Sequence, residues 1–229
     1  MALKLIIGNK NYSSWSMRPW IGLKVAGIPF DEEVIPLYDE GSKAKIIAQS
    51  PAGKVPILID GDVRVWESLA ILEYAAEKFS GFGFWPSDPA ARAHARAIST
   101  EMHAGFVPFR SECSMNFWRP PAKRTLSAEA QANIARVQEI WTEARATYGA
   151  GGPFLFGKFS AADAMYAPVV QRFIAYDIDV SAPVKAYMQA MIALPAWQEW
   201  RRAALREPWV IEKFEYDWPE VTRIPAEAA

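Results

Sequence analysis

The sequence is poor in the residues that build disulfide frameworks and metal sites. Its 229 residues include a single cysteine, Cys113, and only two histidines, His94 and His103. One cysteine cannot form a disulfide within the chain, which favours a reducing compartment and predicts a cytoplasmic location. Because no cysteine pair accompanies the two histidines, the sequence has no zinc-binding pattern and we expect no metal.

An excess of positive charge and long apolar runs are also absent. The chain carries 25 basic and 26 acidic residues, so it has no basic surplus to hold a phosphate backbone, and we expect no nucleic acid partner. No stretch approaches the roughly 18 apolar residues that span a bilayer, and the opening MALKLIIGNK is typical of a strand rather than a signal peptide. We therefore expect no membrane association.

The first 80 residues alternate between strand and helix patterns. A short apolar run opens the chain, and Asp60-Gly61 is a strong hairpin signal between two later runs. Two strands joined by a helical crossover lie parallel, whereas a hairpin adds an antiparallel pair, so the order predicts a small mixed sheet covered by helices. The expected elements are strands at 3–8, 30–37, 55–59 and 63–66, and helices at 16–26, 42–49 and 68–79.

The second part of the chain is predicted to be helical throughout. Residues 81–87 are rich in glycine, proline and aromatics and are typical of a linker, so we expect one domain at 1–80 and another at 88–229. Up to about residue 208 no strand pattern appears. The expected helices run from Pro89 to about Trp118 and from Ser127 to about Tyr148, with others starting near Ser160, Val184 and Pro195.

Ser13 and Ser14 lie where the first strand leads into the first helix. A helix start presents free backbone N–H groups and a partial positive charge, and a serine hydroxyl there can also donate to a thiolate. The plainer interpretation is that both serines only cap the helix.

Two further turns have a similar double interpretation. Pro56 opens a strand, and a cis Val55–Pro56 bond would turn the Val55 backbone outward to pair with a peptide; a trans edge-strand proline is the alternative. Glu67 and Ser68 stand at the next strand-to-helix junction, where they can hold an α-amino acid end or simply cap the helix.

Together, in this order and spacing, these segments resemble the cytosolic glutathione transferases. Ser13 to Arg18 is similar to the serine turn of the zeta class and its bacterial relatives, Gly53 to Pro56 to the cis-proline loop, and Glu67 to Ile71 to the glutathione-gripping turn. Ser160 and Asp163 resemble the capping box of the helical domain. The resemblance extends to about residue 208 and implies a thioredoxin-like N-terminal domain, an all-helical C-terminal domain and a homodimer.

The resemblance also implies a role for each matching residue. Ser13 or Ser14 hydrogen-bonds the glutathione sulfur, with Ser13 at the matching position. Lys54 neutralises the glycine carboxylate, Val55 before Pro56 pairs with the cysteinyl unit, and Glu67 with Ser68 holds the γ-glutamyl end. Glutathione is then a co-substrate whose thiolate attacks a small electrophilic molecule, as in detoxification.

Trp15 stands where the zeta motif has cysteine, which disfavours a thiol-based activity and weakens the likeness to a maleylacetoacetate-type isomerase. Arg18 is either a pocket cation or a helix-surface residue. His103, Phe106 and Arg110 share one face if the long helix continues, and they face the thiol or serve as ordinary core and structural residues. The candidates for the acceptor pocket are Trp15, Arg18, His103, Phe106, Arg110, Met115 and Trp118.

Other activities remain open on the same fold. A glutathione-dependent isomerase, a dehalogenase and a peroxidase-type reductase all use the same thiolate. A non-catalytic binding or scaffold protein would keep the fold with weak affinity for glutathione or none. The sequence does not identify the electrophile, because the pocket walls come from scattered helical positions.

Overall fold

A four-stranded mixed sheet forms in the first third of the chain. The structure is a computed structural model that describes residues 3–215 and 224. The first strand pairs in parallel with the second and antiparallel with the third, and the third forms a hairpin with the fourth around Asp60-Gly61. The predicted sheet is confirmed, with strand order β2-β1-β3-β4 for β1 (Leu3–Ile7), β2 (Phe30–Val34), β3 (Ile57–Asp60) and β4 (Val63–Trp66).

Helices cover both faces of this sheet. Leu5 and Ile7 of β1 point to the face covered by α1 (Ser14–Val25) and α3 (Ser68–Lys78), and they join the main core. Ile6 points the other way and packs with Ile46 of α2 (Ser42–Gln49). Because successive side chains of a strand alternate between faces, a continuous apolar run is what a sheet buried on both sides requires.

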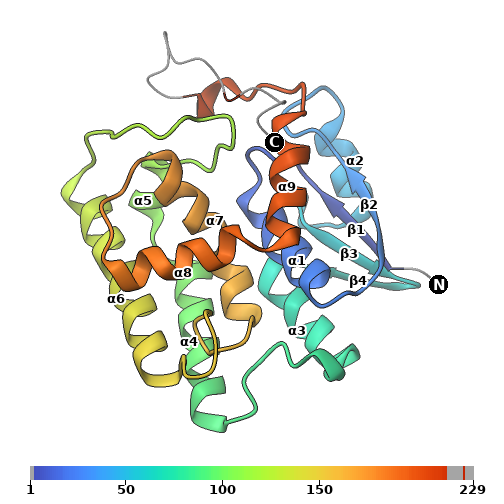
Figure 1. Cartoon of the computed structure of the whole chain (residues 1–229). Helices are drawn as coiled ribbons and strands as arrows, with labels where there is room; N and C mark the ends of the chain where they lie inside the picture. The colour runs from blue at the N-terminus through green and yellow to red at the C-terminus, as the bar shows by residue number, and fades with distance from the viewer. Residues whose placement is uncertain (1–2, 216–223, 225–229) are drawn as a thin grey trace.

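The remaining chain is helical. Figure 1 shows the sheet on the right and most of these helices on the left, with α1 and α9 between them. The predicted helices after Ser127, Ser160, Val184 and Pro195 are confirmed. The elements are a short 3-10 turn (Ser80–Phe82), α4 (Pro89–Ala104), α5 (Val107–Glu112), α6 (Ala128–Tyr148), α7 (Ala161–Ala175), α8 (Ala182–Ile192), α9 (Pro195–Leu205) and a second 3-10 turn (Glu212–Phe214).

The prediction of one helix from Pro89 to about Trp118 is wrong. The first helix ends at Ala104, Phe106 adopts a left-handed backbone with φ of 61°, and α5 then starts in a new direction and ends at Glu112. Gly105 is the C-cap, and its N–H donates to the carbonyl of Glu101. Glycine at this place is an ordinary signal for the end of a helix, and it ends α4 although the sequence on either side has a helical pattern.

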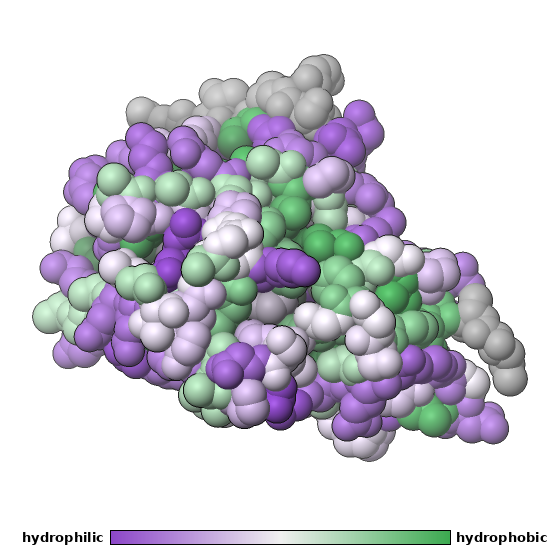
Figure 2. Space-filling model, turned by 60° about the horizontal axis from the view of Figure 1, so that its bottom comes forward, coloured by the Kyte–Doolittle hydropathy of each residue, from purple (hydrophilic) through white to green (hydrophobic). Residues whose placement is uncertain are grey.

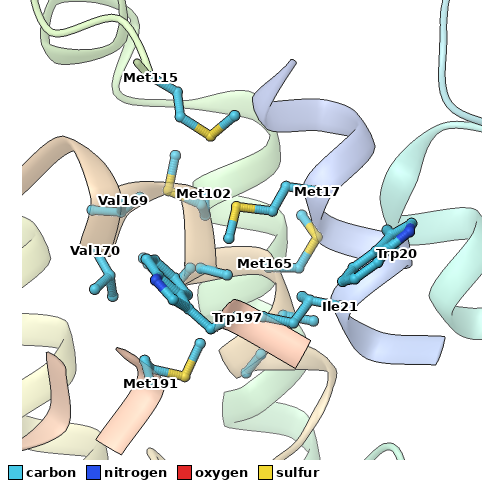
Figure 3. Close-up of a cluster of buried hydrophobic side chains, with 14 of the residues drawn as sticks. Met17, Trp20, Ile21, Met102, Met115, Met165, Val169, Val170, Met191 and Trp197 are labelled. Carbon is cyan, nitrogen blue, oxygen red and sulfur yellow. The ribbon is translucent and has the colours of Figure 1, made fainter. Parts of the chain in front are cut away.

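The two parts of the molecule meet where α1 packs against α7. A methyl group at Gly22 of α1 would lie 2.6 Å from Leu72 Cδ2 of α3, so the missing side chain makes room for Leu72, whereas Ala164 Cβ of α7 would be at an ordinary contact distance of 3.6 Å. Figure 3 shows the apolar cluster around this contact, in which Met17, Met102 and Met165 converge. Unbranched methionines fill the irregular space between helices that come from different parts of the chain.

The predicted reach of Asp163 back to the start of α7 is confirmed. The fully buried carboxylate of Asp163 accepts from the Ser160 N–H and hydroxyl at 2.8 Å each and from the Leu155 N–H at 3.0 Å. Burial raises the pKa of Asp163 to about 6, although these hydrogen bonds lower it. The carboxylate thus ties the preceding loop to the first turn of the helix.

The surface mixes polar and apolar side chains. On the face drawn in Figure 2, hydrophobic side chains form patches that hydrophilic ones interrupt. None of the helices in the described part of the chain has the length and apolar character needed to cross a bilayer. Among the described residues, the large apolar side chains that are exposed are Tyr38, Ile47, Val63, Trp66, Val107 and Val210.

Candidate functional site

The first of two adjoining pockets lies between the start of α1, the segment after β2, helix α2 and the loop before β3. Its volume is about 740 Å³. Three turns that are far apart in the sequence contribute to it, which is the convergence that the sequence analysis expected. Of the predicted site residues it is lined by Ser13, Trp15, Lys54, Val55, Pro56, Glu67 and His103.

A second pocket of about 490 Å³ adjoins the first. The two share the side chains of Ser13 and Trp15, together with Leu37 and Tyr38. The rest of its lining comes from Tyr12 and Ser14, from α5 and the residues just after it, from α7 and from the C-terminal segment, and it includes the cations Arg110, Arg172 and Lys213. Among the described residues that line it there is no carboxylate.

Ser13 stands at the junction of the two pockets. It is the N-cap of α1, and its hydroxyl oxygen accepts from the Ser16 N–H at 3.4 Å. The Ser16 hydroxyl lies 2.8 Å from the Ser13 oxygen and accepts from the Gly8 N–H at 3.0 Å. Either hydroxyl can donate in this contact, and when Ser16 donates, the Ser13 proton is available to the pockets.

Ser14 is held differently. Its hydroxyl oxygen accepts from Arg172 Nη2 at 3.2 Å. Ser14 lines the second pocket but not the first. Arg172 also donates to the carbonyls of Arg110 and Cys113. The structure therefore separates the two serines, since Ser13 faces both pockets and Ser14 is part of the cationic wall of one.

Trp15 forms the partition between the pockets, and two guanidinium groups lie against its ring. The guanidinium carbon of Arg18 is 4.3 Å and that of Arg110 is 4.4 Å from the ring centroid. Burial of Arg18 and repulsion by Arg110 and Arg172 lower the pKa of Arg18. Arg18 has neither the surface position nor the pocket position that was expected, because it is only 1% exposed and lines neither pocket. Its Nε and Nη1 atoms have no hydrogen-bond partner among the described residues.

Glu67 enters the first pocket from a strained backbone. Its φ of 70° is unusual for a residue with a side chain, and such outliers gather at functional sites. The Oε2 atom of Glu67 lies 3.5 Å from His103 Nε2. Burial and then the nearby Arg18 lower the pKa of His103, against the attraction of Glu67. The lowered pKa favours the neutral imidazole at pH 7, so His103 adds little positive charge beside Glu67.

Two lysines and a cis proline complete the first pocket. The Val55–Pro56 peptide is cis, as the cis-proline loop of the resemblance implies. Lys54 is exposed at the rim, and Lys43 of α2 lines the pocket beside it. Lys43 Nζ donates to the Gly53 carbonyl at 2.8 Å, which fixes the loop before Lys54.

Besides Arg18, three predicted site residues lie away from both pockets. The Ser68 hydroxyl is fully buried and points to Met165 Sδ at 3.9 Å. Phe106 belongs to the core because the helix breaks beside it, so it shares no helix face with His103 and Arg110. Trp118 is also core, and its Nε1 donates to the Ala204 carbonyl at 2.9 Å. Met115 lines the second pocket as expected.

Sequence reasoning missed several pocket residues. Arg172 had a usable signal, because an arginine within the apolar run of α7 must find partners inside the fold. Lys43, Tyr38 and Lys213 had none, since each is an ordinary polar or surface residue in its local sequence. All four line a pocket only because distant segments meet there.

Neither the cysteine nor a metal cluster marks a second reactive centre. Burial raises the pKa of the Cys113 thiol to about 12, so this thiol is inert at neutral pH. Within residues 3–215 and 224, no group of three histidine, cysteine, aspartate or glutamate side chains is placed to hold a metal ion.

Two protein-family models match the chain. The model described as the N-terminal domain of glutathione S-transferase matches residues 12–78, and the model described as its C-terminal domain matches residues 127–203. The first match contains the serine turn, the cis-proline loop and Glu67, and the second contains the capping box of α7. The two models therefore cover both parts of the molecule described above.

Individual relatives agree with these models. The chain is 39% identical to a probable maleylacetoacetate isomerase of Caenorhabditis elegans over 43% of its own length, but the match covers only 46% of that protein. It is 29% identical to the maleylacetoacetate isomerase of Rhizobium meliloti, over 80% of this chain and 87% of that one. A glutathione transferase homologue from Burkholderia gl BGR1, solved with bound glutathione, has the same fold, with a TM-score of 0.68, 22% identity and coverage of 90% and 100%.

Proposed function

Because the chain belongs to the glutathione S-transferase family, we propose that it binds glutathione in the first pocket and activates its thiol for attack on an electrophile in the second. The observation that carries the proposal is the position of Ser13, whose hydroxyl lies at a helix start on the wall that the two pockets share. A sulfur beside it is within reach of both ligands.

Each end of glutathione has a partner of suitable charge in the first pocket. Glu67 is an acceptor for the γ-glutamyl ammonium, and the N–H groups at the start of α3 suit its carboxylate. Lys54 and Lys43 are positioned as cations for the glycine carboxylate. The backbone of Val55 then pairs with the cysteinyl unit as an added strand.

The chemistry needs a modest shift of the thiol pKa. A free thiol with a pKa of about 8.5 is only about 3% ionised at pH 7, and a shift of about 2 units makes the thiolate the main form. One charge-assisted hydrogen bond contributes about 1.5–3 kcal/mol and a helix start up to about 1 kcal/mol, which together suffice. The thiol proton leaves to water, the C–S bond forms, and the leaving group departs with its electron pair.

An isomerase is the second candidate, and the cations of the second pocket favour it. Arg110, Arg172 and Lys213 suit an acceptor that carries carboxylates. In that reaction the thiolate adds to one carbon of a C=C bond, the remaining single bond rotates, and the thiolate leaves again. Product analysis with an unsaturated diacid separates the candidates, because isomerisation leaves glutathione unchanged whereas conjugation consumes it.

The test of the main proposal is a titration of the bound thiol by ultraviolet absorbance, with turnover of an aryl halide and of a peroxide. A bound thiol pKa below that of free glutathione, with turnover, supports it. A pKa equal to that of free glutathione together with no turnover refutes it. Calorimetry with millimolar glutathione then identifies a scaffold protein, which would bind weakly or not at all.

The assembly and setting are part of the same proposal. We infer two domains at residues 1–80 and 88–229, a homodimer, and a cytoplasmic role in the detoxification of small electrophiles. Light scattering tests the dimer directly, because a mass of 25.6 kDa would mean a single chain.

A further inference from the structure

The loop that leads into Ser13 is held by the far end of the chain. Glu207, which follows α9, accepts from the backbone N–H of Lys10 at 2.6 Å through Oε1 and from that of Asn11 at 2.9 Å through Oε2. Trp200 of α9 donates from Nε1 to the Lys10 carbonyl at 3.0 Å. Residues almost 200 positions away therefore hold the backbone N–H groups of Lys10 and Asn11 and the carbonyl of Lys10.

These contacts reach Ser13 through a short turn. The Asn9 carbonyl accepts from the N–H groups of Tyr12 at 3.2 Å and of Ser13 at 2.8 Å. Lys10 and Asn11 are the two residues inside this turn, and Glu207 holds the N–H of each. A change in the orientation of these two peptide units therefore moves Ser13 relative to both pockets.

The carboxylate of Glu207 is in a costly environment for a purely structural group. Burial raises its pKa to about 7, although the N–H groups of Asn11 and Lys10 lower it. The neighbouring charges are those of Lys10 and Glu32, which pair with each other at 2.6 Å. Glu207 is thus a partly buried carboxylate whose hydrogen bonds go to the backbone that leads into Ser13.

We propose that Glu207 is a positioning residue that sets the Ser13 turn through the N–H groups of Lys10 and Asn11, and so couples the C-terminal segment to ionisation of the glutathione thiol. The inference rests on the proposed function. It assigns to the segment after α9 a part in thiol activation, although Glu207 lines neither pocket.

The test compares the full-length wild-type chain with E207Q and with E212Q. The amide of E207Q keeps the size of the side chain but has only one acceptor oxygen for two donors. Glu212 is an exposed carboxylate in the same C-terminal segment, so E212Q makes the same chemical change without touching the loop.

Three quantities are measured for each protein: the pKa of the bound glutathione thiol by ultraviolet absorbance, kcat and KM with 1-chloro-2,4-dinitrobenzene, and the glutathione Kd by calorimetry. In E207Q we expect the thiol pKa to rise by about one unit and kcat at pH 6.5 to fall about tenfold. The glutathione Kd changes by about threefold or less, because the residues that bind the two ends of the tripeptide are unchanged. E212Q behaves as the wild type.

A thiol pKa in E207Q equal to that of the wild type overturns the inference, even if the variant is less stable. If E207Q does not fold, E207D gives the same readout, since it keeps the charge but is too short to reach both N–H groups. Failure of both variants to fold assigns Glu207 to stability alone and also overturns the inference. A wild-type chain that binds no glutathione instead refutes the proposed function, which the calorimetry detects separately.

Discussion

The two pockets that meet at Ser13 are built in different ways. The first is formed mostly by turns from residues 13 to 67, each of which joins consecutive elements around the small sheet. The second draws its distinctive residues from α5, α7 and the segment after α9, which are all far from Ser13 in the sequence. Their charges differ too, because the first has both signs and the second has cations without a lining carboxylate among the described residues.

This difference indicates a division of labour. A pocket lined by the carboxylates of Asp39 and Glu67 and by two lysines suits a ligand with charges of both signs, such as a tripeptide. A pocket with several cations, hydroxyl groups and aromatic rings imposes less geometry and selects mainly by charge and size. Ser13 and Trp15 are among the four residues that line both pockets.

The largest expected effect is at the shared wall. S13A removes the hydroxyl that faces both pockets, and we expect kcat/KM to fall about 100-fold, as for the loss of one preorganised donor. S14A removes a hydroxyl held by Arg172, and we expect a fall of about fivefold or less. Steady-state kinetics with one aryl halide measures both.

Thermal unfolding is the control for these variants, since Ser13 also caps α1. A loss of cap costs about 1 kcal/mol and shifts Tm by a few degrees, which does not account for 100-fold in rate. A larger fall in kcat/KM for S14A than for S13A would mean that Ser14, and not Ser13, activates the thiol.

The next effect belongs to the first pocket alone. E67Q removes the charge that faces the γ-glutamyl ammonium, and we expect the glutathione Kd to rise about 20-fold, because a charged hydrogen bond contributes about 1.5–3 kcal/mol. Calorimetry measures it. E77Q, an exposed change on the same helix, is the matched control. Equal affinities in the two variants would remove Glu67 from the binding site.

How far the sequence predicts this molecule follows from the same contrast. Asp60-Gly61, the Ser13 turn and the reach of Asp163 are local signals, because the residues that define each turn are neighbours in the chain. They therefore predict the sheet and the wall of the first pocket. Glu67 at a strand-to-helix junction is predicted as well, although its left-handed backbone is not.

Local sequence signals do not predict the second pocket. Its cations reach one another only after α7 crosses α1 and the C-terminal segment returns to the first loop. The break at Gly105 redirected α5, so the expected common face of His103, Phe106 and Arg110 does not exist. Side-chain direction after a helix break depends on tertiary packing, and one sequence carries little information on it.

A charge-selective second pocket gives a third prediction. R110Q removes one cation, and we expect kcat/KM for 4-chloro-3-nitrobenzoate to fall about tenfold while that for the neutral 4-chloro-3-nitrobenzamide stays nearly constant. The ratio of the two acceptors cancels any general loss of activity. R64Q, an exposed arginine on the far strand β4, serves as control. An equal fall for both acceptors would mean that Arg110 acts through Trp15 rather than on the acceptor.

The smallest effect concerns pH and the first pocket. Burial and Arg18 lower the pKa of His103 below that of the unfolded chain, so at mildly acidic pH the unfolded state binds more protons. Stability from His103 is therefore complete above about pH 6.5 and is lost as the pH falls through the lower pKa of the folded state. H103Q lacks this loss, and its Tm should fall less than that of the wild type between pH 7.5 and 5.5, by about 2 °C at most because His103 is partly exposed.

The comparison between the two proteins isolates this group from others that titrate nearby. Glu207 and Asp163, whose folded pKa values are raised to about 7 and about 6, act with the opposite sign: their contribution declines as the pH rises through the same range. Because both proteins contain them, their effect cancels in the difference between the two Tm profiles. Parallel profiles for H103Q and the wild type would show that Glu67 offsets the effect of burial on His103, so that the imidazole has the same pKa in the folded and in the unfolded chain.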